Sequence, residues 1–150
     1  MGLPNPGVGD FSEQLNLLKK SNIPIIASIF GKNSNEFVKL ATKMQEADAL
    51  ELNMSCPHAS GYGLEIGCNP TLVKKITSDV KKACSIPVFV KLSPNLSNIV
   101  EMAIAAEKAN ADAIVAINTV KAMKIDINAR LSMWVMTLCI SRPEPSDISR

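Results

Sequence analysis

The sequence predicts an α/β protein with a parallel sheet, and two observations support this class. Four short segments are almost continuously apolar and rich in Ile, Val, Leu or Ala, which is typical of strands covered on both faces. Segments with helical periodicity alternate with them, so the predicted order of elements is αβαβαβαβ. This order predicts parallel strands joined by right-handed crossovers, in either a barrel or a doubly wound sheet.

The four predicted strands are spaced as β/α units require. They cover residues 24–30, 47–54, 86–92 and 111–118. The links are short except after the second strand, where a long glycine-containing stretch follows. A loop of this length at the carboxyl end of a strand is a candidate for a lid over a site.

The four predicted helices carry start and stop signals. They cover residues 10–21, 35–47, 69–84 and 98–110. Asn33 resembles the first residue of a capping box, and Asn69 directly before a proline is a favourable helix start. Ser97 is the predicted cap of the last helix, and Asn110 is suited to a left-handed stop.

Composition excludes several classes of function. The 150 residues are 47% hydrophobic, which is enough for one core, and their net charge of +2 gives no argument for nucleic acid or a membrane surface. The four cysteines lack CxxC spacing and only one His is present, which argues against a structural zinc site. Without a secretory signal or a spanning apolar run, we expect a soluble, cytoplasmic protein with free thiols.

Each predicted strand contributes one polar residue near its carboxyl end: Ser28, Asn53, Lys91 and Asn118. These ends meet at one edge of a parallel sheet, which is where barrels and doubly wound sheets bind ligands. Lys91 either extends to solvent or supplies a fixed positive charge for an anionic cofactor or a developing anion. The two asparagines end the similar stretches ADALELN and ADAIVAIN. They either cap the strands or bind a planar ligand with amide groups.

Cys56 is the reactive side chain that the sequence favours. It follows a strand, precedes Pro57 and opens the long loop, where a thiol can act as a nucleophile or a general base. His58 is two residues away, but a cysteine-protease arrangement has little support because no other His is present. Cys84 is expected to be a small buried hydrophobic residue.

Five motifs, taken together and in order, resemble class 1 dihydroorotate dehydrogenases, in particular the 1B or archaeal type. They are MGLPNPG (1–7), ELNMSCPH (51–58), PVFVKLSPN (87–95), AINTV (116–120) and KIDI (124–127). The resemblance implies a flavoprotein oxidoreductase on a (β/α)8 TIM barrel. Such an enzyme uses FMN to oxidise dihydroorotate to orotate in de novo pyrimidine (UMP) biosynthesis.

The resemblance also implies roles for individual residues. Cys56 matches the catalytic base that removes the C5 proton of the substrate while hydride leaves C6 for the flavin. The positions that match cofactor contacts are Ser28, Asn53, Lys91 and Ile117. The positions that match substrate contacts are Met1, Gly2, Leu3, Asn53, Asn118 and Thr119.

The resemblance leaves both the substrate and the electron acceptor open. His58 stands where many members carry a substrate-binding Asn, and SCPH also occurs in the barrel domain of dihydropyrimidine dehydrogenase. The stretch KAMKIDI favours the dihydroorotate branch. Type 1B enzymes pass electrons to NAD through an iron–sulfur and FAD partner subunit, whereas type 1A enzymes use fumarate. A full-length enzyme of this kind is expected to be a homo-oligomer.

The length predicts only part of a barrel. A complete barrel needs about 250 residues and eight strands, and four strands are predicted here. We therefore expect residues 1–130 to form about four central β/α units of a flavin barrel with open sheet edges. Residues 131–150 are expected to be an atypical tail, either disordered or frameshifted. A fragment of this kind is expected to be inactive by itself.

Overall fold

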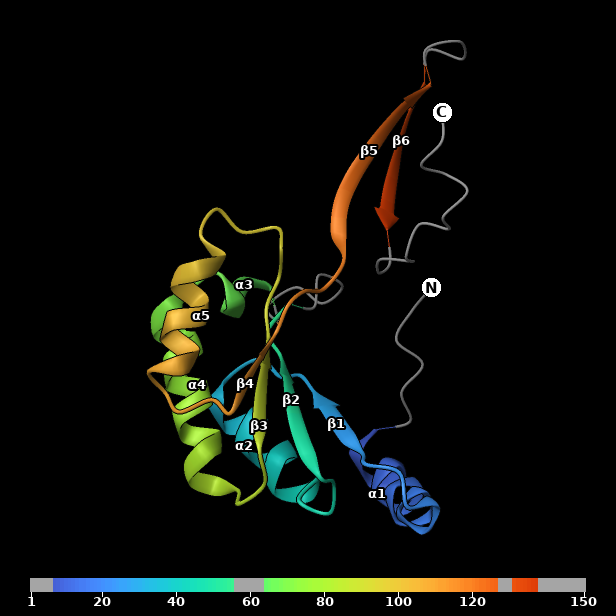
Figure 1. Cartoon of the computed structure of the whole chain (residues 1–150), viewed down its shortest axis with the longest axis vertical. Helices are drawn as coiled ribbons and strands as arrows, with labels where there is room; N and C mark the ends of the chain where they lie inside the picture. The colour runs from blue at the N-terminus through green and yellow to red at the C-terminus, as the bar shows by residue number, and fades with distance from the viewer. Residues whose placement is uncertain (1–6, 56–63, 127–130, 138–150) are drawn as a thin grey trace.

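A four-stranded parallel sheet forms the centre of the computed structural model, which describes residues 7–55, 64–126 and 131–137 (Figure 1). Its strands are β1 (Ile26–Ile29), β2 (Ala49–Asn53), β3 (Val88–Lys91) and β4 (Ala113–Val115). They are parallel and lie in the order β1-β2-β3-β4. A doubly wound sheet reverses its strand order at some point, so strictly sequential order is the arrangement of a barrel wall.

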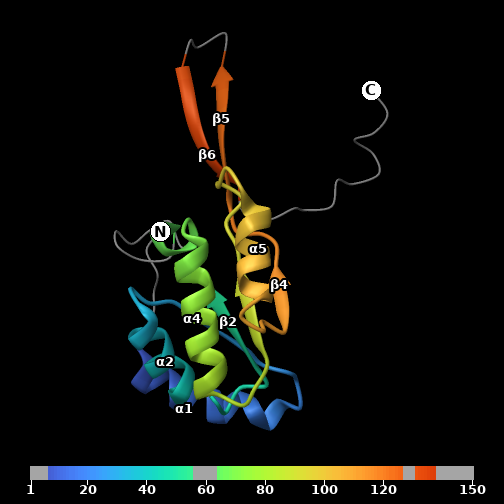
Figure 2. The ribbon, with the colours of Figure 1, turned by 90° about the vertical axis from the view of Figure 1, so that its left-hand side faces the viewer.

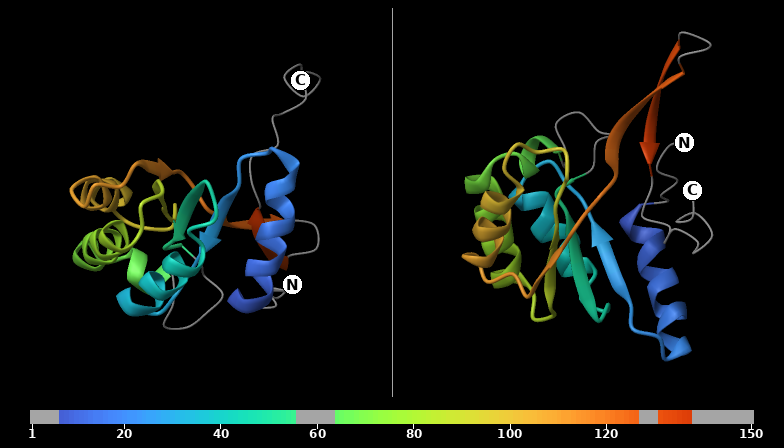
Figure 3. Two further views of the ribbon diagram at one scale, coloured as in Figure 1. Left: turned by 90° about the horizontal axis from the view of Figure 1, so that it is seen from below. Right: turned by 45° about the horizontal axis from the view of Figure 1, so that its top comes forward.

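The described residues form four main helices, three of which lie as a layer along one face of this sheet. They are α1 (Val8–Leu18), α2 (Ser34–Lys43), α4 (Pro70–Ala83) and α5 (Ile99–Glu107), with the short turns η1 (Lys19–Ser21) and α3 (Leu64–Gly67). Figure 2 shows α2, α4 and α5 side by side as one layer, whereas α1 lies beyond the β1 edge of the sheet (Figure 3). Within the described residues, no helix is long and apolar enough to cross a membrane.

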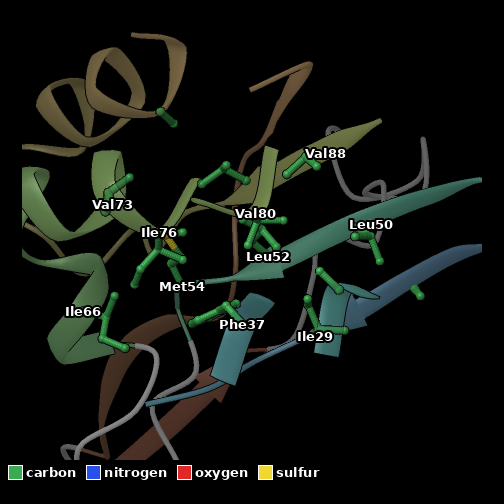
Figure 4. Close-up of a cluster of buried hydrophobic side chains, with 14 of the residues drawn as sticks. Ile29, Phe37, Leu50, Leu52, Met54, Ile66, Val73, Ile76, Val80 and Val88 are labelled. Carbon is green, nitrogen blue, oxygen red and sulfur yellow. The ribbon is translucent and has the colours of Figure 1, made fainter. Parts of the chain in front are cut away.

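The hydrophobic core lies between the sheet and this layer of helices. The fully buried strand residues Leu50 and Leu52 are register partners of Val88 and Val90, which are equally buried. The helices add Ala41 to the core, together with Phe37, Val73, Ile76 and Val80, which are labelled in Figure 4. In β1, β2 and β3, alternate residues therefore supply one packed face, as the pleat requires.

The opposite face of the sheet is open in the described part of the chain. In β1, Ile26 is 54% exposed and Ser28 is exposed, while the alternating Ala27 and Ile29 are buried. The expectation of strands covered on both faces is therefore wrong for these residues. The physical reason is that the inner face of a barrel is covered by the opposite wall, and the four strands form a single wall.

The predicted helix starts agree with the structure to within two residues, whereas α1, α2 and α5 end three or four residues before their predicted ends. Asn33 Oδ1 accepts a hydrogen bond from Glu36 N at 3.0 Å, and Asn110 has a left-handed φ of 62°. Asn69 caps α4 by accepting from two backbone N–H groups of its first turn. The predicted cap Ser97 is wrong by one residue, because Asn98 accepts from Glu101 N and is an equally good cap.

A two-stranded hairpin that was not predicted follows the sheet. Strands β5 (Val120–Asp126) and β6 (Leu131–Thr137) pair antiparallel and project away from the sheet (Figures 1 and 3). The first seven residues of the expected tail thus belong to a strand, and residues 138–150 lie outside the described residues. The division of the chain at residue 130 stays a prediction.

Candidate functional site

Two of the predicted polar residues meet at a carboxylate on the open face of the sheet. Ser28 and Glu51 are register partners on β1 and β2, and Ser28 Oγ donates to Glu51 Oε1 at 2.7 Å. Lys91 Nζ lies 3.4 Å from the same oxygen. Glu51 was missed in the sequence analysis. A charged residue within an otherwise apolar strand, two positions before Asn53, is the signal that could have found it.

The ion pair restrains the ammonium of Lys91 at this face. The Lys91 and Glu51 side chains are only 26% and 14% exposed, so both charges are partly shielded from solvent. An ammonium group has three N–H donors. One is directed at Glu51, which leaves donors and a positive charge for a ligand at the open face.

A second network joins the two predicted asparagines through a residue that was not predicted, Ser55. Ser55 N and Ser55 Oγ donate to Asn53 Oδ1 at 3.2 and 2.8 Å. Asn118 Nδ2 donates to Ser55 Oγ at 2.7 Å and to Ser55 O at 3.3 Å. Asn118 Oδ1 in turn accepts from Thr119 N at 2.7 Å and Thr119 Oγ1 at 3.2 Å.

The segment that carries Asn118 is tied to the end of β3. Asn118 N donates to Leu92 O at 3.1 Å, and Asn95 Nδ2 donates to Thr119 O at 2.8 Å. Ile117, the remaining predicted cofactor contact, directly precedes Asn118 and is half-buried after a cis peptide bond with Ala116. These bonds bring Asn118 and Thr119 to the edge at which β2 and β3 end.

The two networks adjoin each other, because Asn53 and Lys91 are register partners on β2 and β3. Side chains of partners in a parallel sheet point to the same face, so both lie on the open one. Among the described residues, none accepts a hydrogen bond from Asn53 Nδ2. The shared edge therefore offers amide donors beside a cation, which suits a planar ligand with acceptor atoms or negative charge. A separate cavity of about 410 Å³ between α1, β1 and α2 includes Ser28 but is lined mainly by apolar residues.

Gly67 anchors the returning end of the loop that follows β2. A Cβ atom at this position would lie 2.0 Å from the carbonyl oxygen of Met54, so the close approach requires glycine. Met54 precedes Ser55 and is fully buried. The contact therefore packs α3 against the strand end that carries the amide network.

Several predicted residues lie outside the described part of the chain. They are Met1, Gly2, Leu3, Cys56 and His58. Of the described cysteines, Cys84 is half-buried and its thiol donates to Val80 O at 3.1 Å. Burial raises the pKa of this thiol above its ordinary value, so it stays protonated at neutral pH. Cys84 therefore behaves mainly as the packing residue that the sequence predicts.

Comparison with known proteins connects this site to a family. The family model described as Dihydroorotate dehydrogenase matches residues 1–135. A relative from Thermoplasma acidophilum is 55% identical over 133 residues, and the match covers 87% of this chain and 44% of the relative. One from Methanocaldococcus jannaschii is 50% identical over 135 residues, again with 87% and 44% covered. Both are named dihydroorotate dehydrogenase B (NAD(+)), catalytic subunit, and the chain spans less than half their length.

Similarity to solved structures concerns the fold alone. The carboxyl transferase domain of Rhizobium etli pyruvate carboxylase, solved with 3-hydroxypyruvate, has a TM-score of 0.58 at 13% identity. The match covers 74% of this chain and 19% of that one. Together with the sequential parallel sheet, the comparisons confirm the predicted fold class, part of a (β/α)8 barrel with four β/α units. Because the family match extends from residue 1 to residue 135 of 150, the chain belongs to the dihydroorotate dehydrogenase family.

Proposed function

We propose that this chain supplies the central β/α units of an FMN-dependent enzyme that oxidises dihydroorotate to orotate in de novo pyrimidine (UMP) biosynthesis. The observation that carries the proposal is the pair of Asn53 and Lys91, side by side at the carboxyl edge of the sheet. A barrel enzyme binds its substrate at this edge. Relatives that are named as dihydroorotate dehydrogenases support the choice of substrate.

The residues at this edge fit a flavin. Its isoalloxazine ring is planar, carries several hydrogen-bond acceptors and becomes anionic on reduction. Asn53 Nδ2 would donate to ring acceptors, and Lys91 would stabilise negative charge on the reduced ring. Ser28 and Ile117 are the other proposed cofactor contacts. When bound, FMN supplies the acceptor for the hydride that leaves the substrate.

Cys56 is the proposed catalytic base, and it removes a proton from C5 of dihydroorotate. It directly follows Ser55, whose backbone N–H, carbonyl and hydroxyl all take part in the amide network. The chain is thus anchored immediately before the base. A thiol suits this task because its pKa can be brought close to the working pH.

The proposed substrate contacts come from three parts of the chain. They are Met1, Gly2, Leu3, Asn53, Asn118 and Thr119. The amide N–H groups of an asparagine can donate hydrogen bonds to the carbonyl oxygens of a pyrimidine ring. Of this set, the structure describes Asn53, Asn118 and Thr119, which belong to one hydrogen-bond network.

The partners of the complete protein are proposed from the names of the relatives. "Catalytic subunit" and "NAD(+)" in those names favour a separate iron–sulfur and FAD subunit that passes electrons to NAD. They do not favour fumarate as the acceptor, or a uracil-type substrate as in dihydropyrimidine dehydrogenase. We further propose a cytoplasmic homo-oligomer for the full-length enzyme.

A chimera tests the proposal. The matched segment of the Thermoplasma acidophilum relative is replaced by this chain, so that the relative supplies the rest of the barrel. We expect a yellow protein that oxidises dihydroorotate and leaves dihydrouracil almost unchanged. A colourless chimera, or one that prefers dihydrouracil, contradicts the proposal. FMN titration of the chain alone tests separately whether it is inactive by itself: tight stoichiometric binding would contradict that expectation.

A further inference from the structure

We propose that Ser55 is a positioning residue that orients the side chain of Asn53, so that Asn53 presents its two N–H donors to a ligand. Ser55 is 2% exposed and lies two residues beyond the end of β2. Its hydroxyl stands between Asn53, two residues earlier, and Asn118, 63 residues later. The identity of the ligand rests on the proposed function, whereas the orientation of the amides does not.

Backbone groups determine which way each amide faces. A backbone N–H can only donate a hydrogen bond. The acceptor atom of Asn53, Oδ1, must therefore face Ser55 N, which lies 3.2 Å away. In the same way, Asn118 Oδ1 must face Thr119 N at 2.7 Å. Asn118 Nδ2 is then directed toward Ser55, whose carbonyl oxygen can only accept.

The hydroxyl of Ser55 links the two asparagine side chains by two hydrogen bonds, and in both bonds the donor lies on the Asn118 side and the acceptor on the Asn53 side. It accepts from Asn118 Nδ2 at 2.7 Å, so its own hydrogen is donated to Asn53 Oδ1 at 2.8 Å. A hydroxyl has one donor hydrogen and can accept at the same time. Removing this hydroxyl disconnects the two asparagines and leaves Asn53 with one bond from Ser55 N.

The direction of these hydrogen bonds determines which ligand groups Asn53 can bind. Both acceptor positions of Asn53 Oδ1 are occupied by Ser55, and no described residue accepts from Asn53 Nδ2. The side chain therefore presents donors on the open face, next to the ammonium of Lys91. A ligand with carbonyl oxygens or unprotonated ring nitrogens matches this arrangement. A ligand that presents an N–H group at the same place is rejected, because two donors would face each other.

Nuclear magnetic resonance of the 15N-labelled 150-residue chain tests the orientation directly. The side-chain amide signals of Asn53 and Asn118 are compared in wild type, Ser55→Ala and Ser55→Cys. We expect the Asn118 amide hydrogens to exchange with solvent roughly tenfold faster in both variants, the factor that corresponds to one lost hydrogen bond. The matched control is Ser93→Ala: Ser93 is also buried just after a strand, but it accepts from Asn95 N. Unchanged exchange in the Ser55 variants of a folded chain would overturn the proposal.

FMN titration of the 15N-labelled chimera, with and without each serine substitution, separates this inference from the proposed function. If both hold, FMN shifts the Asn53 amide signals in the unsubstituted chimera, and Ser55→Ala raises the apparent Kd roughly tenfold while Ser93→Ala does not. If FMN shifts no signals but exchange at Asn118 still depends on Ser55, the orientation stands and FMN binding by the chimera is disproved. If FMN shifts the signals with equal affinity in the unsubstituted chimera and in Ser55→Ala, the positioning role is disproved and FMN binding stands.

Discussion

Glu51 of β2 restrains Lys91 of β3 on the open face of the sheet, with 3.4 Å between Glu51 Oε1 and Lys91 Nζ. The same oxygen accepts a hydrogen bond from Ser28 of β1. One carboxylate therefore links three neighbouring strands at the edge where the cofactor is proposed to bind. Because Glu51 already holds the Lys91 side chain in place, Lys91 loses little conformational entropy when its ammonium group interacts with a ligand.

Glu51→Gln is expected to lower the free energy of unfolding of the chain by about 1 kcal/mol, because a partly shielded ion pair is lost. The change is measured by urea unfolding at neutral pH. Glu46→Gln is the control, since Glu46 pairs with Lys19 at 3.0 Å where the two side chains are 66% and 41% exposed. That variant should lose less than about 0.5 kcal/mol. Equal losses in the two variants would show that the Glu51 pair is energetically an ordinary surface pair.

Gly67→Ala is expected to destabilise the chain by about 3 kcal/mol or more, because the new Cβ atom would lie 2.0 Å from the backbone oxygen of Met54. Thermal or urea unfolding measures the loss. Gly9→Ala is the matched control, because nothing lies within 4 Å of its added Cβ atom and Gly9 is within α1. Alanine is the better helix former, so the control should be neutral or stabilised by up to about 1 kcal/mol. A tolerated Gly67→Ala would disprove the close packing of α3 on β2.

Asp112 is expected to make the stability of the chain depend on pH. Burial opposes ionisation of its carboxyl group, but hydrogen bonds from Lys81 and from the N–H of Val88 outweigh burial and lower its pKa. A lowered pKa in the folded state stabilises the protein above the unfolded pKa of about 3.9. This contribution is lost as the pH falls through the folded pKa.

Urea unfolding at pH 7 and in mildly acidic to strongly acidic buffers checks the effect of Asp112. Asp112→Asn should be less stable than wild type at neutral pH, and the difference between the two should shrink at acidic pH. Lys81→Gln should reduce the same pH dependence in part, because the hydrogen bond from Val88 remains. A difference between wild type and Asp112→Asn that stays constant with pH would rule out ionisation of Asp112 as its cause.

Cys56→Ser in the chimera is expected to lower the rate of dihydroorotate oxidation about 100-fold or more at neutral pH, as the loss of a general base does. A serine hydroxyl is a much weaker base at that pH, so the remaining rate should rise as the pH increases. Cys68→Ser is the control, because Cys68 is exposed and has no proposed role. Full activity in Cys56→Ser would show that another group removes the proton.

The similarity between ADALELN and ADAIVAIN has a structural reason that the sequence analysis missed. Asp48 N donates to Ile25 O, and Asp48 Oδ2 accepts from Ile25 N at 2.7 Å. Asp112 forms the same pair of bonds with Val88, and its Oδ2 accepts from Val88 N at 2.6 Å. Each aspartate thus sets the start of a strand against its neighbour.

The hairpin shows where prediction from local pattern ends. Strands β1 to β4 are apolar runs between capped helices, so each element carries its own signal. Within the part of the chain that the structure describes, strands β5 and β6 pair only with each other. Their pairing depends on two segments meeting across a turn, and neither segment has the strict alternation that would have marked it as a strand.

By itself, the sequence determined the order of strands and helices, most helix caps and the edge where polar residues gather. These features depend on short-range periodicity and on side chains bonding to nearby backbone groups. Only the tertiary structure decided which polar groups meet. Glu51 bonds to residues 23 and 40 positions away, and Ser55 bonds to a residue 63 positions away. Such contacts depend on the register of distant strands, which no local pattern encodes.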